Sequence, residues 1–330
     1  MRNRKGIKQL IKAGCMSALC VLASVGACWG QSSGFRVGVL TAGLTYDPVF
    51  QGMTDGLERL GYRPEKNLSF TVEDSKGNLS DLAGRAKRLV DAKPDALFTV
   101  GTAHSVAAKQ ATSSVPIVFA LVADPVRSGL IAGYQSSRND LSGVSTYAGP
   151  LSGKRLEMLK EMAPATKRVL VLVAPAEGPA RDSLQEVEEA AKKLRMQIVL
   201  REVTSRADIE KLLADQPKSS VDAIFFFPST LVGANIGTLI TKAKENKIPL
   251  VVLNERMVTQ GALFGYGSDF RVVGTQAARL MAKVLKGEKP SDIPTETPEK
   301  FLLAVNLTVA KAIGLKIPRA VLERVDRVVE

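Results

Sequence analysis

The chain has 330 residues, of which 45% are hydrophobic and 24% are charged, and its formal net charge is +12 at pH 7. This length is too great for one ordinary domain and sufficient for two, and the composition is that of a globular protein. The basic residues are dispersed, without a basic run interleaved with aromatic residues, so we expect no nucleic-acid partner.

Residues 1–27 have the pattern of a signal peptide. Basic residues up to Lys12 precede a small, apolar stretch, Ala13 to Ala27, that is too short to span a bilayer comfortably. Removing these residues lowers the net charge to about +7. Val25-Gly26-Ala27-Cys28 resembles the lipobox of bacterial lipoproteins, but it also suits an ordinary signal peptidase. We therefore expect export to the periplasm or cell envelope, with residues 28–34 as a tether, and of the two ways of processing we favour lipidation of Cys28.

The first part of the exported chain alternates strands with helices. Asp47-Pro48 is a good helix start, a capping side chain followed by proline, and Gly61 is a good helix end. Phe50, Met53, Leu57 and Leu60 then fall on one face of this helix. Apolar runs predict strands at 35–40, 68–73, 97–100, 117–122 and 141–146, with helices at about 79–89 and 103–112.

A second series begins after a break near Gly149-Pro150 and a helix at 152–162. Strand-plus-loop units are predicted at 168–175, 197–203, 222–230, 249–255, 262–269 and 301–306. Ser205 and Asp208 indicate a capping box. Residues 286–300 are charged and proline-rich without periodicity, which predicts a crossover on the surface.

Two such series predict an α/β fold of two doubly wound, Rossmann-like lobes, each with a parallel sheet, joined by a hinge. We expect lobe 1 at 35–148, with part of 270–290 returning to it. Lobe 2 would span 149–269, with the C-terminal strand and helix, about 300–318, crossing back to it. Ligands of such sheets bind beyond the carboxyl ends of the strands, so the facing edges predict a cleft.

The chain lacks the residues that most enzymes need. It has one histidine, His104, and its three cysteines all lie in residues 1–28, so we expect no metal site, no cofactor and no disulfide in the exported body. No G-x-S-x-G, H-E-x-x-H, Walker or G-x-G-x-x-G motif occurs. We therefore expect a binding protein with no catalytic residues, in which His104 is hydrogen-bonded or solvated.

Several stretches resemble the family of ABC-transporter substrate-binding proteins that includes the tryptophan/aromatic-amino-acid-type binding proteins. They are GLERLGYRPEKNLSF, DALFTVGTAHSVAAKQATSSVPIVFALVADPVRSGL, LSGVS, GALFGYGSDF, LKGEKPSDIP and FLLAVNLTVAKAIGLKIP. The resemblance implies a type I periplasmic binding protein fold that closes around an amino acid or a similar small polar metabolite. It further implies delivery to a membrane permease driven by a cytoplasmic ATPase. We expect a monomer, held at the membrane if Cys28 is lipidated.

The resemblance also implies ligand-binding residues at strand ends. In lobe 1 they are Thr45, Tyr46, Gly101, Thr102, Ala103, His104, Asp124, Pro125, Ser145 and Thr146. In lobe 2 they are Ser229, Thr230, Asn254, Glu255, Tyr266, Ser268 and Asp269. Thr102, Ala103 and Ser145 would suit a carboxylate, and Glu255 or Asp269 an ammonium group. Tyr46 and Tyr266 could stack on a ring or an apolar side chain. Thr102 could instead cap its helix, and Asp124 could serve only its turn.

Three other functions remain open at this point. A ligand-sensing partner of a membrane signalling protein would use the same fold with no transport role. A repressor effector domain would need a helix-turn-helix where the signal peptide stands. A hydrolase would need a nucleophile beside His104 or beside the strand-end carboxylates.

Overall fold

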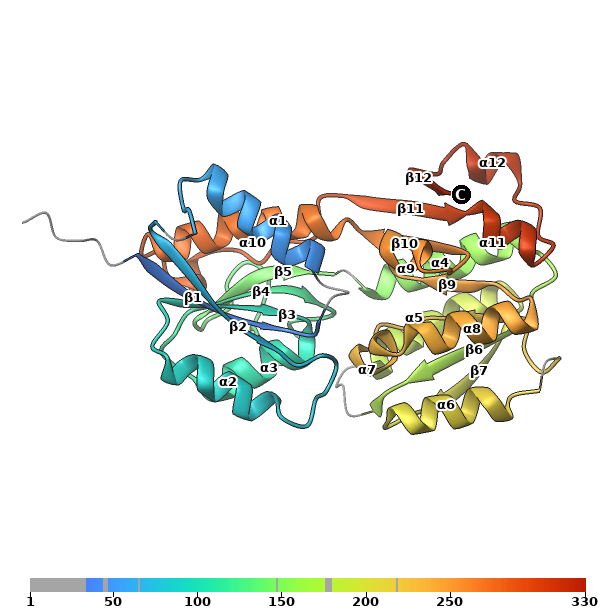
Figure 1. Cartoon of the computed structure of the whole chain (residues 1–330), viewed down its shortest axis with the longest axis horizontal. Coiled ribbons are helices and arrows are strands. Elements are labelled where there is room, and N and C mark those ends of the chain that lie inside the picture. Colours follow the sequence, from blue (N-terminus) through green and yellow to red (C-terminus); the bar gives the residue numbers. More distant parts are fainter. Residues whose placement is uncertain (1–33, 44–46, 65, 147, 176–179, 218) are drawn as a thin grey trace, which may run out of the picture. The chain divides into compact units, whose positions relative to one another are not determined.

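The computed structural model describes residues 34–43, 47–64, 66–146, 148–175, 180–217 and 219–330. Figure 1 shows two sheets, each with helices on both faces. We call the five-stranded sheet with its helices lobe 1 and the seven-stranded sheet with its helices lobe 2. The predicted signal peptide, Cys28 and all but the last residue of the predicted tether lie outside the described residues.

All neighbouring strands of lobe 1 are parallel. The strands are β1 (Phe35–Thr41), β2 (Leu68–Asp74), β3 (Ala96–Val100), β4 (Ile117–Val122) and β5 (Leu141–Ser145), in the spatial order β2-β1-β3-β4-β5. Every residue of β3, β4 and β5 is buried. Such continuous apolar strands are expected where helices cover both faces of a parallel sheet.

The helices of lobe 1 come from both ends of the described chain. They are α1 (Asp47–Arg59), α2 (Leu82–Asp91), α3 (Thr102–Ala111) and α10 (Phe270–Leu285). Helices α1 and α10 pack on the same face of the sheet and approach closely at two glycines. A Cβ atom at Gly52 would lie 2.1 Å from the Arg271 carbonyl oxygen, and one at Gly274 would lie 2.0 Å from that of Val49. Only glycine fits at this crossing.

Two sequence predictions for lobe 1 are wrong. Leu60 follows the end of α1 and is 49% exposed, so it is not part of the buried helix face. Residues 286–300 are not only a surface crossover, because Ile293 is buried and Glu296 forms a parallel bridge with Val144 beside β5. The Ser142 hydroxyl also donates to the Ile293 carbonyl at 2.9 Å. A single extended segment on a sheet edge has too few side chains to show a periodic pattern.

The sheet of lobe 2 is mixed. Its strands are β6 (Arg168–Val173), β7 (Gln197–Glu202), β8 (Ala223–Phe225), β9 (Leu250–Val252), β10 (Phe264–Ser268), β11 (Phe301–Asn306) and β12 (Arg327–Val329), in the order β12-β11-β10-β9-β8-β6-β7. Strand β11 runs antiparallel to β10 and parallel to β12, so the expectation of an all-parallel sheet is wrong at this edge. The reason is that the chain leaves β10 through α10, which packs on lobe 1, instead of through a crossover helix on lobe 2.

Eight helices of lobe 2 are described. They are α4 (Ala148–Met162), α5 (Ala180–Lys193), α6 (Arg206–Asp215), α7 (Thr230–Ala234), α8 (Ile236–Asn246), α9 (Glu255–Thr259), α11 (Leu307–Ala312) and α12 (Arg319–Leu322). Helix α4 starts at Ala148, so Gly149-Pro150 lies in its first turn and is not a break, since proline fits that turn. The predicted capping box of Ser205 and Asp208 is present at α6.

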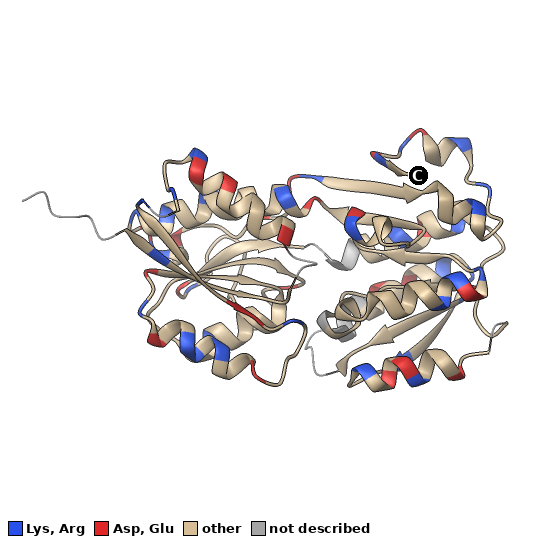
Figure 2. Ribbon diagram, viewed as in Figure 1, with Lys and Arg blue, Asp and Glu red and all other residues tan. Residues whose placement is uncertain are grey.

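Each lobe has apolar cores on the two faces of its sheet. In lobe 1 one core contains α1 and α10, and the other contains residues of α2 and α3. In lobe 2 one core contains α4 and α5, and the other contains α6 and α8. Basic and acidic side chains are interspersed along helices such as α6 (Figure 2). Of the described helices, none is long and apolar enough to cross a membrane.

Candidate ligand-binding site

The loop after β3 leads directly into α3. Gly101 has φ +94°, a value that favours glycine, and the helix begins without a side-chain cap. The Thr102 hydroxyl oxygen accepts a hydrogen bond from the Ala123 N–H at 3.1 Å, so it links the ends of β3 and β4 and does not cap its own helix. Ala103 is half-buried in the first turn. The first N–H groups of α3 therefore have no side-chain acceptor of their own at the carboxyl edge of the sheet.

His104 is fully buried, so the alternative that it is simply solvated is wrong. Its Nε2 atom is 2.9 Å from the Ser75 hydroxyl, which follows β2, and its Nδ1 atom has no hydrogen-bond partner among the described residues. Burial lowers the pKa of His104 to about 4, because the charged imidazolium is disfavoured in an apolar environment. The ring is therefore neutral at pH 7 and fixes the loop after β2 to α3.

Asp124 and Pro125 follow β4. The Asp124 carboxylate accepts from the backbone N–H groups of Val126 and Arg127 at 3.1 and 3.0 Å, and its side chain is 36% exposed. This is the local turn geometry that the sequence allowed for. Pro125 is buried beneath the turn.

Ser145 and Thr146 end the last strand of lobe 1. Ser145 is fully buried, and its hydroxyl has no hydrogen-bond partner in the part of the chain that the structure describes. The Thr146 hydroxyl is likewise buried without a partner there. Both backbones are held, because the Ser145 N–H donates to Glu296 and the Thr146 N–H donates to Val122, each at 2.9 Å. Two hydroxyls thus stand in fixed positions with unused hydrogen-bonding capacity.

The predicted polar residues of lobe 2 mostly begin helices. Ser229, Asn254 and Asp269 accept backbone N–H bonds as the N-caps of α7, α9 and α10. The Nδ2 atom of Asn254 is buried without a partner among the described residues. Of Thr230 only the backbone is described, at the first position of α7.

One pocket brings four predicted residues of lobe 2 together. It has a volume of about 960 Å³, and its lining includes Asn254, Glu255, Ser268 and Asp269. Both carboxylates already have cationic neighbours: Lys300 lies 3.6 Å from Asp269, and Arg327 lies 3.6 Å from Glu255. An ammonium group at either carboxylate would therefore compete with a cation of the chain itself.

Tyr266 is half-buried and packs its ring on Phe301, with centroids 6.3 Å apart. Its backbone carbonyl accepts a 2.7 Å hydrogen bond from Nε of Arg155, a residue that sequence reasoning missed. Arg155 is 2% exposed and lies on the same helical face as Leu159 and Met162. A lone arginine among the apolar positions of a helix was the signal that could have found it.

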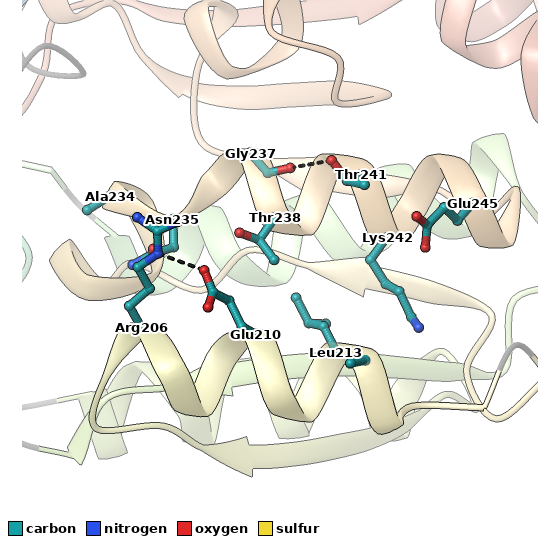
Figure 3. A pocket seen from close by; sticks show the side chains of 11 residues that line it. Arg206, Glu210, Leu213, Ala234, Asn235, Gly237, Thr238, Thr241, Lys242 and Glu245 are labelled. Carbon is teal, nitrogen blue, oxygen red and sulfur yellow. Dashed lines mark hydrogen bonds and ion pairs between the residues drawn. The ribbon is translucent and has the colours of Figure 1, made fainter.

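Two further pockets differ in position. One of about 490 Å³ is lined by residues 76–80 after β2 and by residues 203–206 after β7, so it also lies at strand carboxyl ends. The other, of about 520 Å³, lies between α6 and α8, with Leu213 and the paired side chains of Arg206 and Glu210 in its lining (Figure 3). The lining of this second pocket includes none of the predicted residues.

Two of the predicted ligand-binding residues lie outside the described part of the chain. Thr45 and Tyr46 are not described. Within the described ranges, no group of three or more His, Cys, Asp or Glu side chains could hold a metal ion. The described residues at these strand ends provide fixed hydroxyls, backbone N–H groups and capped helix ends, which can bind a polar molecule.

Known proteins resemble this chain over most of its length. Residues 37–329 match the family model described as "ABC transporter substrate binding protein". The tyrosine-binding protein of Clostridioides difficile is 25% identical over 270 residues, which covers 82% of this chain and 77% of that protein.

Solved structures are similar over nearly the whole chain. A conserved domain protein of Vibrio cholerae is 28% identical with a TM-score of 0.83, covering 89% of this chain and 99% of the other. The ABC domain of Streptococcus pneumoniae, solved in complex with L-Trp, is 24% identical with a TM-score of 0.84, covering 90% and 100%. The fold is that of the type I periplasmic binding proteins, and the chain belongs to the family of ABC transporter substrate-binding proteins.

Proposed function

We propose that this protein is the extracytoplasmic solute-binding component of an ABC-type importer. It closes its two lobes around a small molecule and delivers that molecule to a membrane permease. The observation that carries this proposal is the family match over residues 37–329, which spans both lobes. Family membership agrees with the signal-peptide pattern of residues 1–27 and with the lack of enzyme motifs.

The proposed solute is an amino acid, and tyrosine is the first to test. The tyrosine-binding relative supports this choice. So do the buried hydroxyls of Ser145 and Thr146, because polar atoms left unpaired inside a protein cost free energy that a ligand with acceptors or donors would recover. The predicted strand-end residues, including Thr45, Tyr46 and Thr230, belong to this proposal.

The first experiment identifies the molecule directly. Protein purified from its native host is denatured, and released small molecules are identified by mass spectrometry. In parallel, the melting temperature is measured with each of the twenty amino acids. At one hundred times Kd, a ligand stabilises the folded state by about 2.7 kcal/mol. Absence of any thermal shift, with no small molecule released, would contradict solute binding.

The transport step needs a separate measurement. Uptake of the radiolabelled solute is compared in the native host, in a strain that lacks this protein, and in that strain with the gene restored. We expect uptake to fall in the deletion and to return on restoration. Normal uptake in the deletion strain, combined with clear solute binding, would favour a sensing role without transport.

A further inference from the structure

Helix α4 carries a buried cation that the proposed site does not yet use. Arg155 is 2% exposed. Its Nε atom donates to the Tyr266 carbonyl at 2.7 Å, and its Nη1 atom donates to the Ser152 hydroxyl at 3.3 Å. Both partners are neutral, and neither bond uses Nη2. The guanidinium is therefore held in place by two hydrogen bonds and keeps donor capacity in reserve.

No carboxylate of the described residues pairs with Arg155. The nearby acidic residues of α4 are engaged elsewhere: Glu157 pairs with Lys154 at 2.9 Å, and Glu161 pairs with Arg324. Burial lowers the pKa of Arg155 to about 9, which reflects the cost of a cation without a counter-ion. Buried charges in proteins are normally paired, so an unpaired guanidinium at this depth needs an explanation.

The position of Arg155 supplies that explanation. Helical side chains tilt toward the N-terminus of their helix, and the bond to Ser152 shows that Arg155 reaches toward the start of α4. On β10, Tyr266 lies two residues before Ser268, about 7 Å along the strand. Side chains at these two positions share a face of the sheet. The guanidinium thus contacts β10 at Tyr266, two residues before Ser268, and both of these are ligand-binding residues expected in lobe 2.

We propose that Arg155 is the anchor for a carboxylate of the ligand, which supplies the counter-ion that the described chain lacks. A guanidinium binds a carboxylate through two parallel N–H bonds. Nε is held by Tyr266, but Nη2 is available and Nη1 has a second N–H group beside the one that it donates to Ser152. Ser152 positions the group through its contact with Nη1. This inference rests on the proposed function and specifies which end of an amino acid lobe 2 binds.

The test compares L-tyrosine with L-tyrosinamide, in which a neutral amide replaces the carboxylate. Titration calorimetry on the full chain is expected to show at least about 100-fold tighter binding of L-tyrosine. Arg155→Gln should weaken L-tyrosine binding by about 100-fold and leave L-tyrosinamide binding unchanged. Arg155→Lys keeps the charge without the planar fork, so its affinity for L-tyrosine should fall between the two. Lys154→Gln is the matched control, since it removes the same charge from an exposed position of the same helix.

Equal losses for both compounds in Arg155→Gln would assign Arg155 a structural role and overturn the inference. Unchanged affinity for both would overturn it as well. If Arg155→Gln does not fold, the inference is still tested by the wild type and by Arg155→Lys. Equal wild-type affinities for L-tyrosine and L-tyrosinamide would overturn it. In all of these cases the proposed function stands, since tyrosine still binds. A wild type that binds no amino acid would overturn both this inference and the proposed solute.

Discussion

The strand ends of the two lobes satisfy their polar groups in different ways. In lobe 1, neutral side chains bond across elements: Ser75 with His104, Thr99 with Ser105, and Thr102 with the Ala123 N–H. Helices α2 and α3 begin there without side-chain caps. In lobe 2, the strand-following helices α6, α7, α9 and α11 have side-chain caps, provided by Ser205, Ser229, Asn254 and Asn306. Asp269, after β10, caps α10 in the same way.

This difference determines where each lobe can bind charge. The first N–H groups of α3 are not used by a cap, so in lobe 1 they are available to an anionic or polar group. Caps in lobe 2 use the corresponding N–H groups, so positive charge must come from a side chain, and Arg155 provides it. A hydroxyl network in one lobe and a buried cation in the other would give a bound solute a defined orientation.

The largest expected effect concerns a feature that the two lobes share, a strand glycine packed against the carbonyl oxygen of a neighbouring segment. A Cβ atom at Gly143 on β5 would lie 2.1 Å from the Phe119 carbonyl oxygen, and one at Gly267 on β10 would lie 2.1 Å from that of Leu253. Gly143→Ala and Gly267→Ala should each lower the free energy of unfolding by about 3 kcal/mol, because backbone must move. Urea unfolding measures this loss, with the unobstructed Gly237→Ala as the control. A free energy of unfolding equal to that of the wild type in either variant would show that its sheet accommodates the movement of the backbone without cost.

Acid should act on lobe 1 first, since it holds the single histidine of the sequence. Unfolded His104 takes up a proton below about pH 6.5, whereas the folded ring stays neutral until about pH 4. The unfolded state therefore binds more protons in this range, and the free energy of unfolding should fall by about 3 kcal/mol as the pH decreases through it. His104→Gln should have a shallower pH dependence in urea unfolding between pH 7 and pH 4. Equal slopes for both proteins would contradict the assignment.

Unpaired and paired hydroxyls of lobe 1 should respond differently to removal. Ser145→Ala deletes a buried hydroxyl without a described partner, so stability should change by less than about 0.5 kcal/mol while affinity for the solute falls roughly tenfold. Thr99→Val is the matched control, because it breaks the 2.8 Å bond to Ser105 and should cost about 1 kcal/mol of stability without affecting binding. Thermal unfolding and calorimetry separate the two effects. Normal affinity in Ser145→Ala would remove this residue from the proposed site.

The smallest effect concerns the caps of lobe 2. Ser205→Ala removes one half of the capping box with Asp208 and should lower the free energy of unfolding by about 1 kcal/mol. Arg206→Ala, which breaks an exposed pair with Glu210, should cost only about 0.3 to 0.5 kcal/mol. Urea unfolding of the two variants tests this order. A reversed order would mean that the helix start does not depend on its cap.

The sequence was most informative where the signal was local. The runs at β3 and β4, the helix start at Asp47 and the capping box at Ser205 were all read from neighbouring residues. Errors arose where a distant segment decides the outcome. Leu60 had the spacing of a core residue but falls beyond the end of its helix. Residues 286–300 looked solvated because only the free edge of β5 gives them a partner.

The strand-end site shows the same division. Its expected location follows from the order of strands and loops, because parallel strands bring their carboxyl ends to one edge. Which side chains there are already engaged depends on contacts between residues far apart in the chain. The sequence could not show that the Ser75 hydroxyl is hydrogen-bonded to the ring of His104. Nor could it show that Lys300 lies beside Asp269 and Arg327 beside Glu255.

By itself, then, the sequence determined the alternation of strands and helices, the family and the expected edge for the ligand, since these depend on local periodicity and on motif order. Only the tertiary structure decided that β11 is antiparallel and that Arg155 is buried without a described counter-ion. The physical reason is that burial and pairing are properties of the packed chain. A charged side chain in the sequence does not reveal whether it will lie in water or against a carbonyl group.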